Sequence, residues 1–313
     1  MKVKVIYMGS FIRSKVGFQS RRTRCAGWLY QPKGIKRPPL VLMAPGLAAE
    51  KTFGLEGYAE AYAQDGYAVY LFDYRNHGDS EGMPRNLVRA SRQLQDWEAA
   101  LARVKRLPNI NTEKIILWGT SLSGGHVLVT AARHPEVAAV VCHAPFTDGF
   151  TTLAGRKVED ILKSVGAGII DAILALGGVR CTIPVVGAPG TFACLNQPGA
   201  AEAYISMIPK VSKWVNNCPA SIFLTLPWYR PINFAAEIKC PVLVVKARED
   251  NIVSVVAIDT TLAKIKQGRL LEIAGGHFDF YQGEIFTALY QQELSFLTEY
   301  GMKNVNAGTE RVK

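Results

Sequence analysis

Six short apolar segments that alternate with helix-like segments constrain the fold of this chain most strongly. Apolar runs of this length are typical of parallel strands that are covered on both faces. The intervening segments repeat apolar side chains every three or four residues, as Leu94, Trp97 and Leu101 do, which is typical of amphipathic helices. This alternation predicts an α/β chain with a mostly parallel, doubly wound sheet and right-handed crossovers. The expected strands are 40–45, 67–74, 114–119, 137–145, 241–247 and 269–275, and the expected helices are 55–64, 86–107, 123–134, 254–266 and 281–299.

The alternation stops between residues 147 and 237. Residues 158–177 have the pattern of a helix, whereas residues 178–231 contain seven prolines and several glycines. A structureless loop of this length is uncommon in a compact domain. We therefore expect residues 147–237 to form a cap inserted between two strands, and residues 1–146 and 238–313 to form the α/β core.

A serine among small residues follows the third expected strand. The sequence is Gly119-Thr120-Ser121-Leu122-Ser123-Gly124-Gly125, and this strand–turn–helix context is typical of a nucleophile on a tight elbow. The start of the helix favours developing negative charge. Ser121 directly follows the strand end and is the predicted nucleophile. Ser123 fits a shifted version of the pattern and is the alternative nucleophile. A glycine-rich strand–helix turn without a catalytic role is the non-enzymatic interpretation of the same residues.

The expected base is His277. It follows the last apolar strand on a glycine-opened loop, which is where the histidine belongs when the chain order is serine, acid, histidine. The other four histidines lie in a turn, in or near the helix after Ser121, or at a strand end; they are His77, His126, His134 and His143.

The expected acid is Asp250, which ends the strand before the last helical crossover. An acid at this place orients the imidazole of the base and stabilises its charged form. Its rival is Asp148, which follows an earlier strand, and Glu249 is a weaker neighbour.

Two backbone N–H groups are expected to bind the oxyanion that forms during attack on a carbonyl. One belongs to Leu122, the residue after the nucleophile. The other should come from the loop after strand 40–45, where Pro45 has no N–H group and Leu47 follows Gly46. Glycine allows a close backbone approach, so Leu47 is the expected second donor.

Three segments resemble one enzyme superfamily: 26–32, 72–82 and 118–127, which read AGWLYQP, FDYRNHGDSEG and WGTSLSGGHV. They resemble the α/β-hydrolases, and more narrowly the X-Pro-dipeptidyl-peptidase-like and dienelactone-hydrolase-like branch that includes polyketide-pathway thiohydrolases and acyltransferases. The resemblance extends over nearly the whole chain and implies an α/β-hydrolase fold with an inserted helical cap. Two positions depart from the branch: Pro45 replaces the usual histidine of the oxyanion loop, and Ser254 replaces a frequent proline after the acid.

These residues predict a serine hydrolase that cleaves an ester or thioester with an apolar acyl group through an acyl-enzyme, without a metal or an organic cofactor. The acyl group is expected to lie against the cap, because ligand pockets are mostly apolar. The apolar candidates are Ile161, Leu162, Val165, Ile169, Ile170, Ile173, Leu174, Trp214, Phe223, Trp228 and Tyr229. Such side chains could equally form the cap's own core.

Other functions remain open at this point. An acyltransferase would use the same acyl-enzyme with a different acceptor, which a dry acceptor pocket favours. An X-Pro-type exopeptidase would need a carboxylate near the nucleophile, and the cap offers Glu159, Asp160, Asp171 and Glu202. A non-catalytic partner-binding module would need neither a base nor an acid.

The net charge of +10 lies in residues 1–49, which carry ten cationic side chains and no acidic one. Part of this segment, 16–32, is expected to form two strands joined by a basic turn. Its charge suits either a solvated hairpin or a docking surface for an acidic or phosphate-bearing partner. Such a partner would be coenzyme A or an acyl carrier protein carrying a thioester. Nucleic acid is not expected, because no binding motif accompanies the charge.

Six scattered cysteines lack the spacing of a metal site and suggest free thiols in the cytoplasm. The longest uncharged runs contain prolines or small polar residues, so no membrane span is expected. Lys4, Arg13 and Lys15 interrupt the N-terminal segment, so no signal peptide is expected either. The sequence leaves the oligomeric state and the acyl group open.

Overall fold

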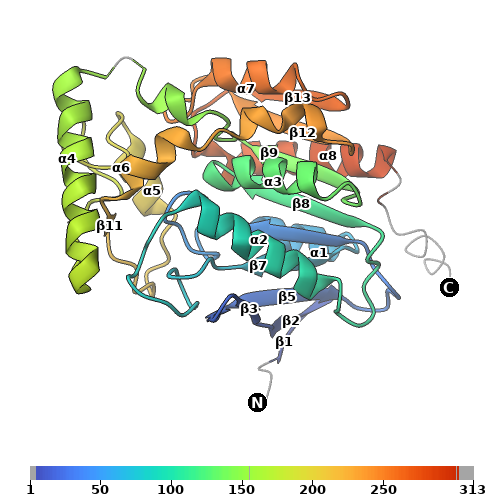
Figure 1. Cartoon of the computed structure of the whole chain (residues 1–313). Coiled ribbons are helices and arrows are strands. Elements are labelled where there is room, and N and C mark those ends of the chain that lie inside the picture. Colours follow the sequence, from blue (N-terminus) through green and yellow to red (C-terminus); the bar gives the residue numbers. More distant parts are fainter. Residues whose placement is uncertain (1–4, 155, 301, 303–313) are drawn as a thin grey trace.

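The computed structural model describes residues 5–154, 156–300 and 302 and contains a nine-stranded sheet (Figure 1). Neighbouring strands are parallel from β7 to β13, whereas β1, β2 and β5 extend the β7 edge in antiparallel fashion. The predicted mostly parallel sheet is confirmed. In spatial order the strands are β1 (Val5–Met8), β2 (Phe11–Lys15), β5 (Gly27–Pro32), β7 (Ala68–Phe72), β6 (Leu40–Ala44), β8 (Ile115–Thr120), β9 (Ala139–His143), β12 (Val242–Ala247) and β13 (Gly268–Ile273).

Helices cover both faces of this sheet, as the doubly wound prediction requires. In Figure 1, α2 (Ala90–Val104), α3 (Leu122–Arg133) and α7 (Val255–Leu262) lie in front of it, and α1 (Glu56–Gln64) and α8 (Gly283–Glu299) lie behind. Every residue of β6, β7, β8, β9 and β12 is buried, which explains their continuous apolar sequences. The edge strand β13 is mostly exposed.

Two predicted elements differ from the structure. The helix expected over 86–107 begins only at Ala90, because Asn86 has a left-handed backbone (φ +55°) and Arg89 is extended. Residues 16–32, expected to form two strands, form three strands instead. β3 (Phe18–Ser20) and β4 (Thr23–Cys25) pair with each other across the basic turn at residues 21–22, and β5 joins the large sheet instead.

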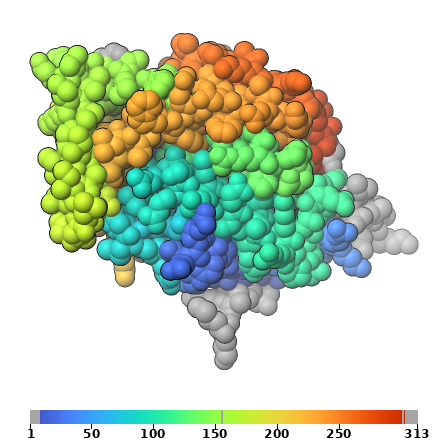
Figure 2. All heavy atoms as spheres, in the orientation of Figure 1, coloured from blue at the N-terminus to red at the C-terminus, as the bar shows by residue number. Residues whose placement is uncertain are grey.

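The segment between β9 and β12 holds the elements of the expected cap (Figures 1 and 2). α4 (Val158–Leu174) forms one side of the molecule, with α5 (Ala200–Ser206) and α6 (Ile222–Thr225) beside it. The cap boundaries at 147 and 237 stay a prediction. The smaller elements are η1 (Gly149–Thr152), η2 (Ala175–Gly177), β10 (Thr182–Ile183), β11 (Cys218–Pro219), η3 (Leu226–Trp228), η4 (Pro231–Asn233) and η5 (Ala235–Glu237).

The strand order reverses around β6, since β7 pairs with one side of it and β8 with the other. Ligands of open α/β sheets bind at such a reversal, outside the carboxyl ends of the strands. The loop after β6 and the turn after β8 both lie at this edge. None of the helices in the described ranges is both long and apolar enough to cross a membrane.

Candidate active site

Ser121 lies on a sharp turn between β8 and α3. Its backbone is left-handed (φ +55°, ψ −122°), a strained conformation for a residue with a side chain. The neighbouring small residues are required: a Cβ atom on Gly119 would lie 2.4 Å from the Ser123 carbonyl oxygen, and one on Gly125 2.2 Å from that of Phe146. Tight packing against strand and helix therefore presents the Ser121 side chain at the sheet edge.

A chain of two hydrogen bonds connects Ser121, His277 and Asp250. The distance from His277 Nε2 to Ser121 Oγ is 3.0 Å, and that from His277 Nδ1 to Asp250 Oδ2 is 2.7 Å. The side chains of His277 and Asp250 are 2% and 0% exposed. The fold thus brings together three residues that are as much as 156 positions apart in the sequence.

The other oxygen of Asp250 is held by the backbone. Its Oδ1 accepts hydrogen bonds from the N–H groups of Ile252 at 2.8 Å and Val253 at 2.9 Å. The carboxylate is therefore fixed between two main-chain donors on one side and the imidazole on the other. This arrangement leaves the Asp250 side chain little freedom to rotate.

Two further carboxylates hold the loop that carries His277. The Gly275 N–H donates to Glu249, and the Gly276 N–H donates to Asp279 at 2.8 Å. Gly275 has φ +122°, a conformation that only glycine adopts readily. Glu249, a weaker acid candidate in the sequence, therefore contacts this loop and not the imidazole.

Asp148, the rival acid, is engaged elsewhere. Both of its carboxylate oxygens accept from Arg230, at 2.8 Å each, and Oδ1 also accepts from the Phe150 N–H. Burial alone would raise the pKa of Asp148, but the hydrogen bonds from Arg230 lower it below its ordinary value. Asp148 makes no hydrogen bond to any histidine among the described residues.

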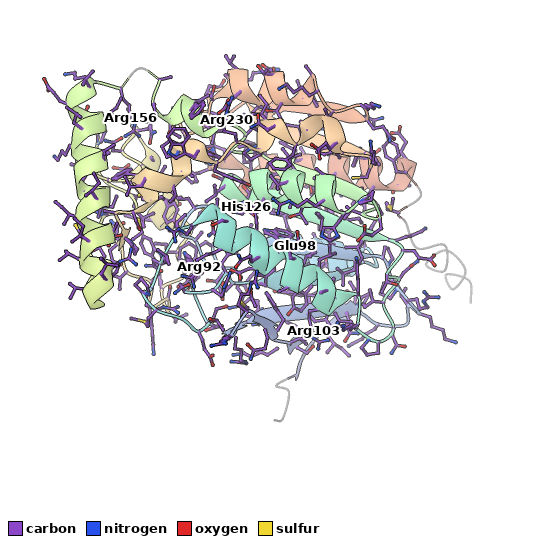
Figure 3. All side chains as sticks on the ribbon, in the orientation of Figure 1. Arg92, Glu98, Arg103, His126, Arg156 and Arg230 are labelled. Atoms are coloured by element: carbon purple, nitrogen blue, oxygen red, sulfur yellow. The ribbon has the colours of Figure 1, made fainter. Side chains whose placement is uncertain are left out.

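Ser123 and the other histidines have separate structural contacts. Ser123 Oγ is buried and hydrogen-bonded to the Tyr74 hydroxyl at 2.8 Å, so it does not cap α3. His126 on α3 (Figure 3) lies between Tyr229 and Gln93, and burial lowers its pKa to about 3. Among the described residues, the side chains of Ser123 and His126 form no hydrogen bond with Ser121. Of the rest, His77 bonds the Arg75 carbonyl, His143 bonds the buried Glu293, and His134 bonds Glu98 and Glu136 at the surface.

The loop after β6 passes beside the Ser121 side chain. A Cβ atom on Gly46 would lie 3.1 Å from Ser121 Cβ and 3.6 Å from Ser121 Oγ, so a glycine permits this approach. Within the described residues, the N–H groups of Leu47 and Leu122 donate to no protein acceptor. Both residues line the cavity in front of Ser121. Their role as oxyanion donors stays a proposal.

Two cap side chains hold this loop. Trp214 is one of the apolar cavity candidates named from the sequence, whereas no sequence pattern marks Tyr204. The Tyr204 hydroxyl donates to the Leu47 carbonyl and the Trp214 indole N–H donates to the Ala48 carbonyl, both at 2.9 Å. Tyr204 lies on α5, more than 150 residues beyond the loop. These bonds hold the Leu47–Ala48 and Ala48–Ala49 peptide groups, which follow the peptide group that carries the Leu47 N–H. They therefore restrict the loop directly next to the proposed oxyanion donor.

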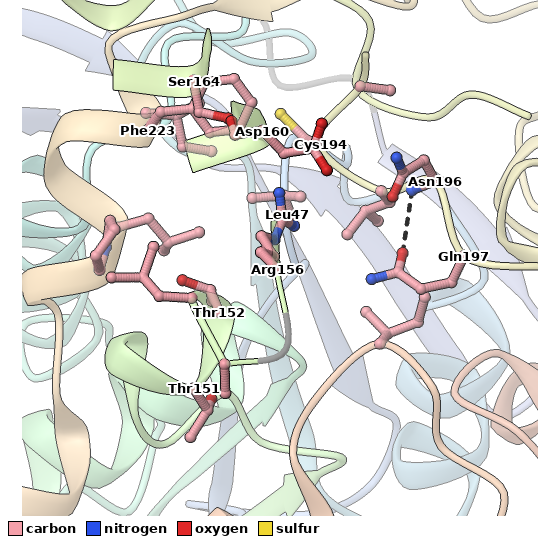
Figure 4. A pocket seen from close by; sticks show the side chains of 18 of the residues that line it. Leu47, Thr151, Thr152, Arg156, Asp160, Ser164, Cys194, Asn196, Gln197 and Phe223 are labelled. Carbon is pink, nitrogen blue, oxygen red and sulfur yellow. Dashed lines mark hydrogen bonds between the residues drawn. The ribbon is translucent and has the colours of Figure 1, made fainter. Parts of the chain in front are cut away.

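A cavity of about 660 Å³ lies between Ser121 and the cap segment (Figure 4). Asp250 also reaches its wall. Core and cap each contribute both apolar and polar side chains to its walls. The apolar lining includes Leu47, Leu122, Phe146, Ile161, Val165, Phe192, Ile222, Phe223, Leu226 and Val253, and the polar lining includes Thr151, Thr152, Ser164, Asn196 and Gln197.

The expectation that the apolar residues of α4 line this cavity is wrong for most of them. Only Ile161 and Val165 do so, and the others point outward; Ile173 is 61% exposed. The face that α4 turns inward is small and polar. Its Gly168 packs against Leu224 and its buried Asp171 pairs with Arg180. Leu162, Ile169, Ile170, Ile173 and Leu174 are exposed.

The aromatic residues expected at the cavity are also divided. Phe223 lines it and Trp214 bonds the loop after β6, whereas Tyr229 is buried against His126 and Trp228 is exposed. Within the described ranges, no group of three or more His, Cys, Asp or Glu side chains could hold a metal ion.

Comparisons with known proteins agree with this architecture. The family model described as serine aminopeptidase, S33, matches residues 36–172. The quorum-quenching protein AidA of Acinetobacter baumannii is 36% identical over 286 residues, which cover 90% of this chain and 93% of the relative. A polyketide transferase of Aspergillus fumigatus is 27% identical over 88% of this chain and 93% of its own.

The solved structure of DcsB in complex with its substrate analogue has the same fold. It matches with a TM-score of 0.82 at 24% identity and covers 92% of this chain and 99% of DcsB. Fold and sequence relatives together identify the chain as an enzyme of the serine hydrolase class. The chain belongs to the α/β-hydrolase family, in the branch that includes polyketide transferases and thiohydrolases.

Proposed function

We propose that this chain cleaves an ester or thioester with a largely apolar acyl group, through an acyl-enzyme on Ser121. The observation that carries the proposal is the hydrogen-bonded series Ser121–His277–Asp250, whose serine opens onto a cavity of about 660 Å³. A serine becomes nucleophilic when a base within hydrogen-bond reach accepts its proton. The 3.0 Å contact of His277 with Ser121 meets this requirement.

The proposed reaction has two halves. Ser121 Oγ attacks the carbonyl carbon while His277 Nε2 takes its proton, and Asp250 stabilises the imidazolium. The N–H groups of Leu122 and Leu47 bind the oxyanion. The intermediate collapses, the bond to the alcohol or thiol breaks, and His277 gives its proton to that leaving group. Water then attacks the acyl-enzyme with His277 as base and releases the acid and free Ser121.

The cavity supports an acyl substrate over a peptide with a free amino terminus. The exopeptidase alternative needs a carboxylate to bind an ammonium group, and three of the four candidates do not line the cavity: Glu159, Asp171 and Glu202. Asp171 is occupied by Arg180. Only Asp160 reaches the wall, and three cations line the same cavity. Relatives named as a thiohydrolase and as polyketide transferases support acyl chemistry.

An acyltransferase is the second candidate. Ligand pockets span about 300–1,000 Å³, so a cavity of about 660 Å³ can hold an acyl chain together with part of an acceptor. The acyl-enzyme would be the same, and an alcohol, amine or thiol would replace water in the second half. The relatives named polyketide transferase favour this candidate.

A partitioning experiment tests both forms of the proposal. An ester and a thioester of one acyl group are turned over in the presence of an added alcohol, and the ratio of new ester to free acid is measured. A common acyl-enzyme on Ser121 predicts the same ratio from both substrates and no turnover by Ser121→Ala. A ratio strongly in favour of the alcohol at low concentration identifies a transferase. Different ratios from the two substrates, or turnover by Ser121→Ala, contradict the proposal.

A further inference from the structure

One arginine in the cavity wall, Arg156, has no side-chain partner among the residues that the structure describes. Arg156 lies between η1 and α4, is partly buried and lines the cavity in front of Ser121. Figure 4 shows its guanidinium nitrogens among the side chains that line the cavity. Among the described residues, this guanidinium forms no ion pair and no hydrogen bond; the only bond of Arg156 is from its backbone N–H to Leu153.

The neighbouring arginines of the cap show that this is unusual within the segment. Arg180 forms a two-pronged contact with Asp171, and Arg230 forms one with Asp148. Both therefore have their charge neutralised within the protein. Arg156 has the same donor set, but its guanidinium lies in the cavity wall where a substrate would bind (Figure 4).

The other charges along the wall do not neutralise Arg156. Lys157 and Lys163 line the same cavity, and the ammonium group of Lys163 lies 4.6 Å from the ring centre of Phe192. Of the two carboxylates in the lining, Asp250 is bound by His277 and the backbone. The other, Asp160, forms no ion pair with any of these cations among the described residues.

Taking a charged group out of water without a partner is costly. A planar guanidinium binds a carboxylate or phosphate with two parallel hydrogen bonds, which makes it selective for these anions. We propose that the cavity takes an acyl substrate that carries a second, anionic group, a carboxylate or a phosphate, and that Arg156 binds this group. The proposal rests on the proposed function and adds a substrate class to it.

The anion has two possible positions on such a substrate. It can be a carboxylate at the end of the acyl chain, or a phosphate on the arm that carries a thioester. Two matched substrate pairs separate them. The first is a series of p-nitrophenyl monoesters of straight-chain dicarboxylic acids against the same compounds with the distal carboxyl methylated. The second is an octanoyl thioester of phosphopantetheine against the same thioester of pantetheine.

We expect wild-type protein to prefer the anionic member of at least one pair. Arg156→Gln should lower kcat/KM for that member about ten- to hundredfold, mainly through KM, because a hydrogen bond to a charged group is lost. Its neutral partner should change less than about threefold, which also shows that the variant is folded. Arg156→Lys should recover only part of the loss, since lysine lacks the two-pronged contact. Arg106→Gln, an exposed site outside the cavity lining, makes the same charge change and should have no effect.

Binding to Ser121→Ala, measured by calorimetry, tests the inference without turnover. The preferred anionic substrate should bind this variant, and Ser121→Ala with Arg156→Gln should bind it about ten- to hundredfold more weakly. If neither the anionic nor the neutral esters are turned over by wild type, the proposed function fails while this binding result still decides the role of Arg156. Equal effects of Arg156→Gln on both members of each pair, or unchanged binding, overturn the inference.

Discussion

Asp250→Asn gives the sharpest test of how the candidate site is ordered. Oδ1 of Asp250 accepts from two backbone N–H groups, those of Ile252 and Val253, and Oδ2 accepts from His277. An asparagine has only one oxygen to offer. If that oxygen stays with the two N–H groups, its amide N–H faces His277 Nδ1 and forces the proton onto Nε2. The imidazole is then in the wrong tautomer and cannot accept the Ser121 proton.

The size of the effect follows from the cost of the opposite orientation. Turning the amide so that its oxygen meets His277 would leave two partly buried N–H donors unpaired, at about 1–3 kcal/mol each. The productive orientation is therefore disfavoured by about 2–6 kcal/mol, and tenfold in rate corresponds to about 1.4 kcal/mol. We expect kcat to fall between about 30-fold and about 10⁴-fold.

The assay is hydrolysis of p-nitrophenyl butyrate near neutral pH, with thermal unfolding as the check that each variant is folded. Asp148→Asn removes the same charge from the rival residue, which contacts Arg230 and not His277, and should keep most of the activity. The reasoning is refuted if Asp250→Asn retains activity within about threefold of wild type. It is equally refuted if Asp148→Asn is folded and inactive.

Three further predictions concern packing, pH and salt. Gly125→Ala places a Cβ atom 2.2 Å from the Phe146 carbonyl oxygen and 2.9 Å from Pro231. We therefore expect the free energy of unfolding to fall by about 1–3 kcal/mol. An unchanged melting temperature would contradict the tight packing behind Ser121. Burial lowers the pKa of His126 to about 3 and that of His77 to about 4, so the unfolded chain binds protons at these residues before the folded chain does as the pH falls below about 6.5. The free energy of unfolding measured in urea should therefore decrease from pH 6.5 towards pH 4, and it should decrease less steeply in His77→Gln. The same pH dependence in wild type and variant would count against this cause. If the substrate is a thioester on an acidic or phosphorylated carrier, rising salt should lower kcat/KM for this thioester and not for a small neutral ester. Replacing Arg21, Arg22 and Arg24 by Gln should weaken the dependence of kcat/KM on salt. An unaltered dependence would indicate that the basic N-terminal segment is a solvated hairpin.

The sheet was predictable because burial on both faces leaves a local pattern in each strand. β6, β8 and β12 are continuous apolar runs, and each lies within about one residue of its expected bounds. The start of α2 was not predictable from the sequence. It is set by the left-handed backbone of Asn86 and the extended backbone of Arg89, and these conformations depend on the surrounding structure. An apolar pattern also does not say which side a helix turns inward, and in α4 the inward side is Gly168 and Asp171.

The candidate site divides in the same way. Ser121 and His277 each follow a strand, and they occur in the chain order expected of a nucleophile and a base. Their positions in the candidate site could therefore be predicted from the sequence. The contacts of Tyr204 with Leu47 and of Glu249 with Gly275 join residues that no local pattern links. Within the described part of the chain, Arg156 differs from Arg180 and Arg230 in having no acidic partner. This difference is a property of the folded protein.

Covalent labelling tests whether Ser121 is the nucleophile. A fluorophosphonate probe reacts with a serine that an adjacent base activates, and peptide mass spectrometry locates the adduct. We expect one adduct on Ser121, none in Ser121→Ala, and much slower labelling in His277→Ala. An adduct on Ser123, or full labelling of the Ser121→Ala variant, would contradict this expectation.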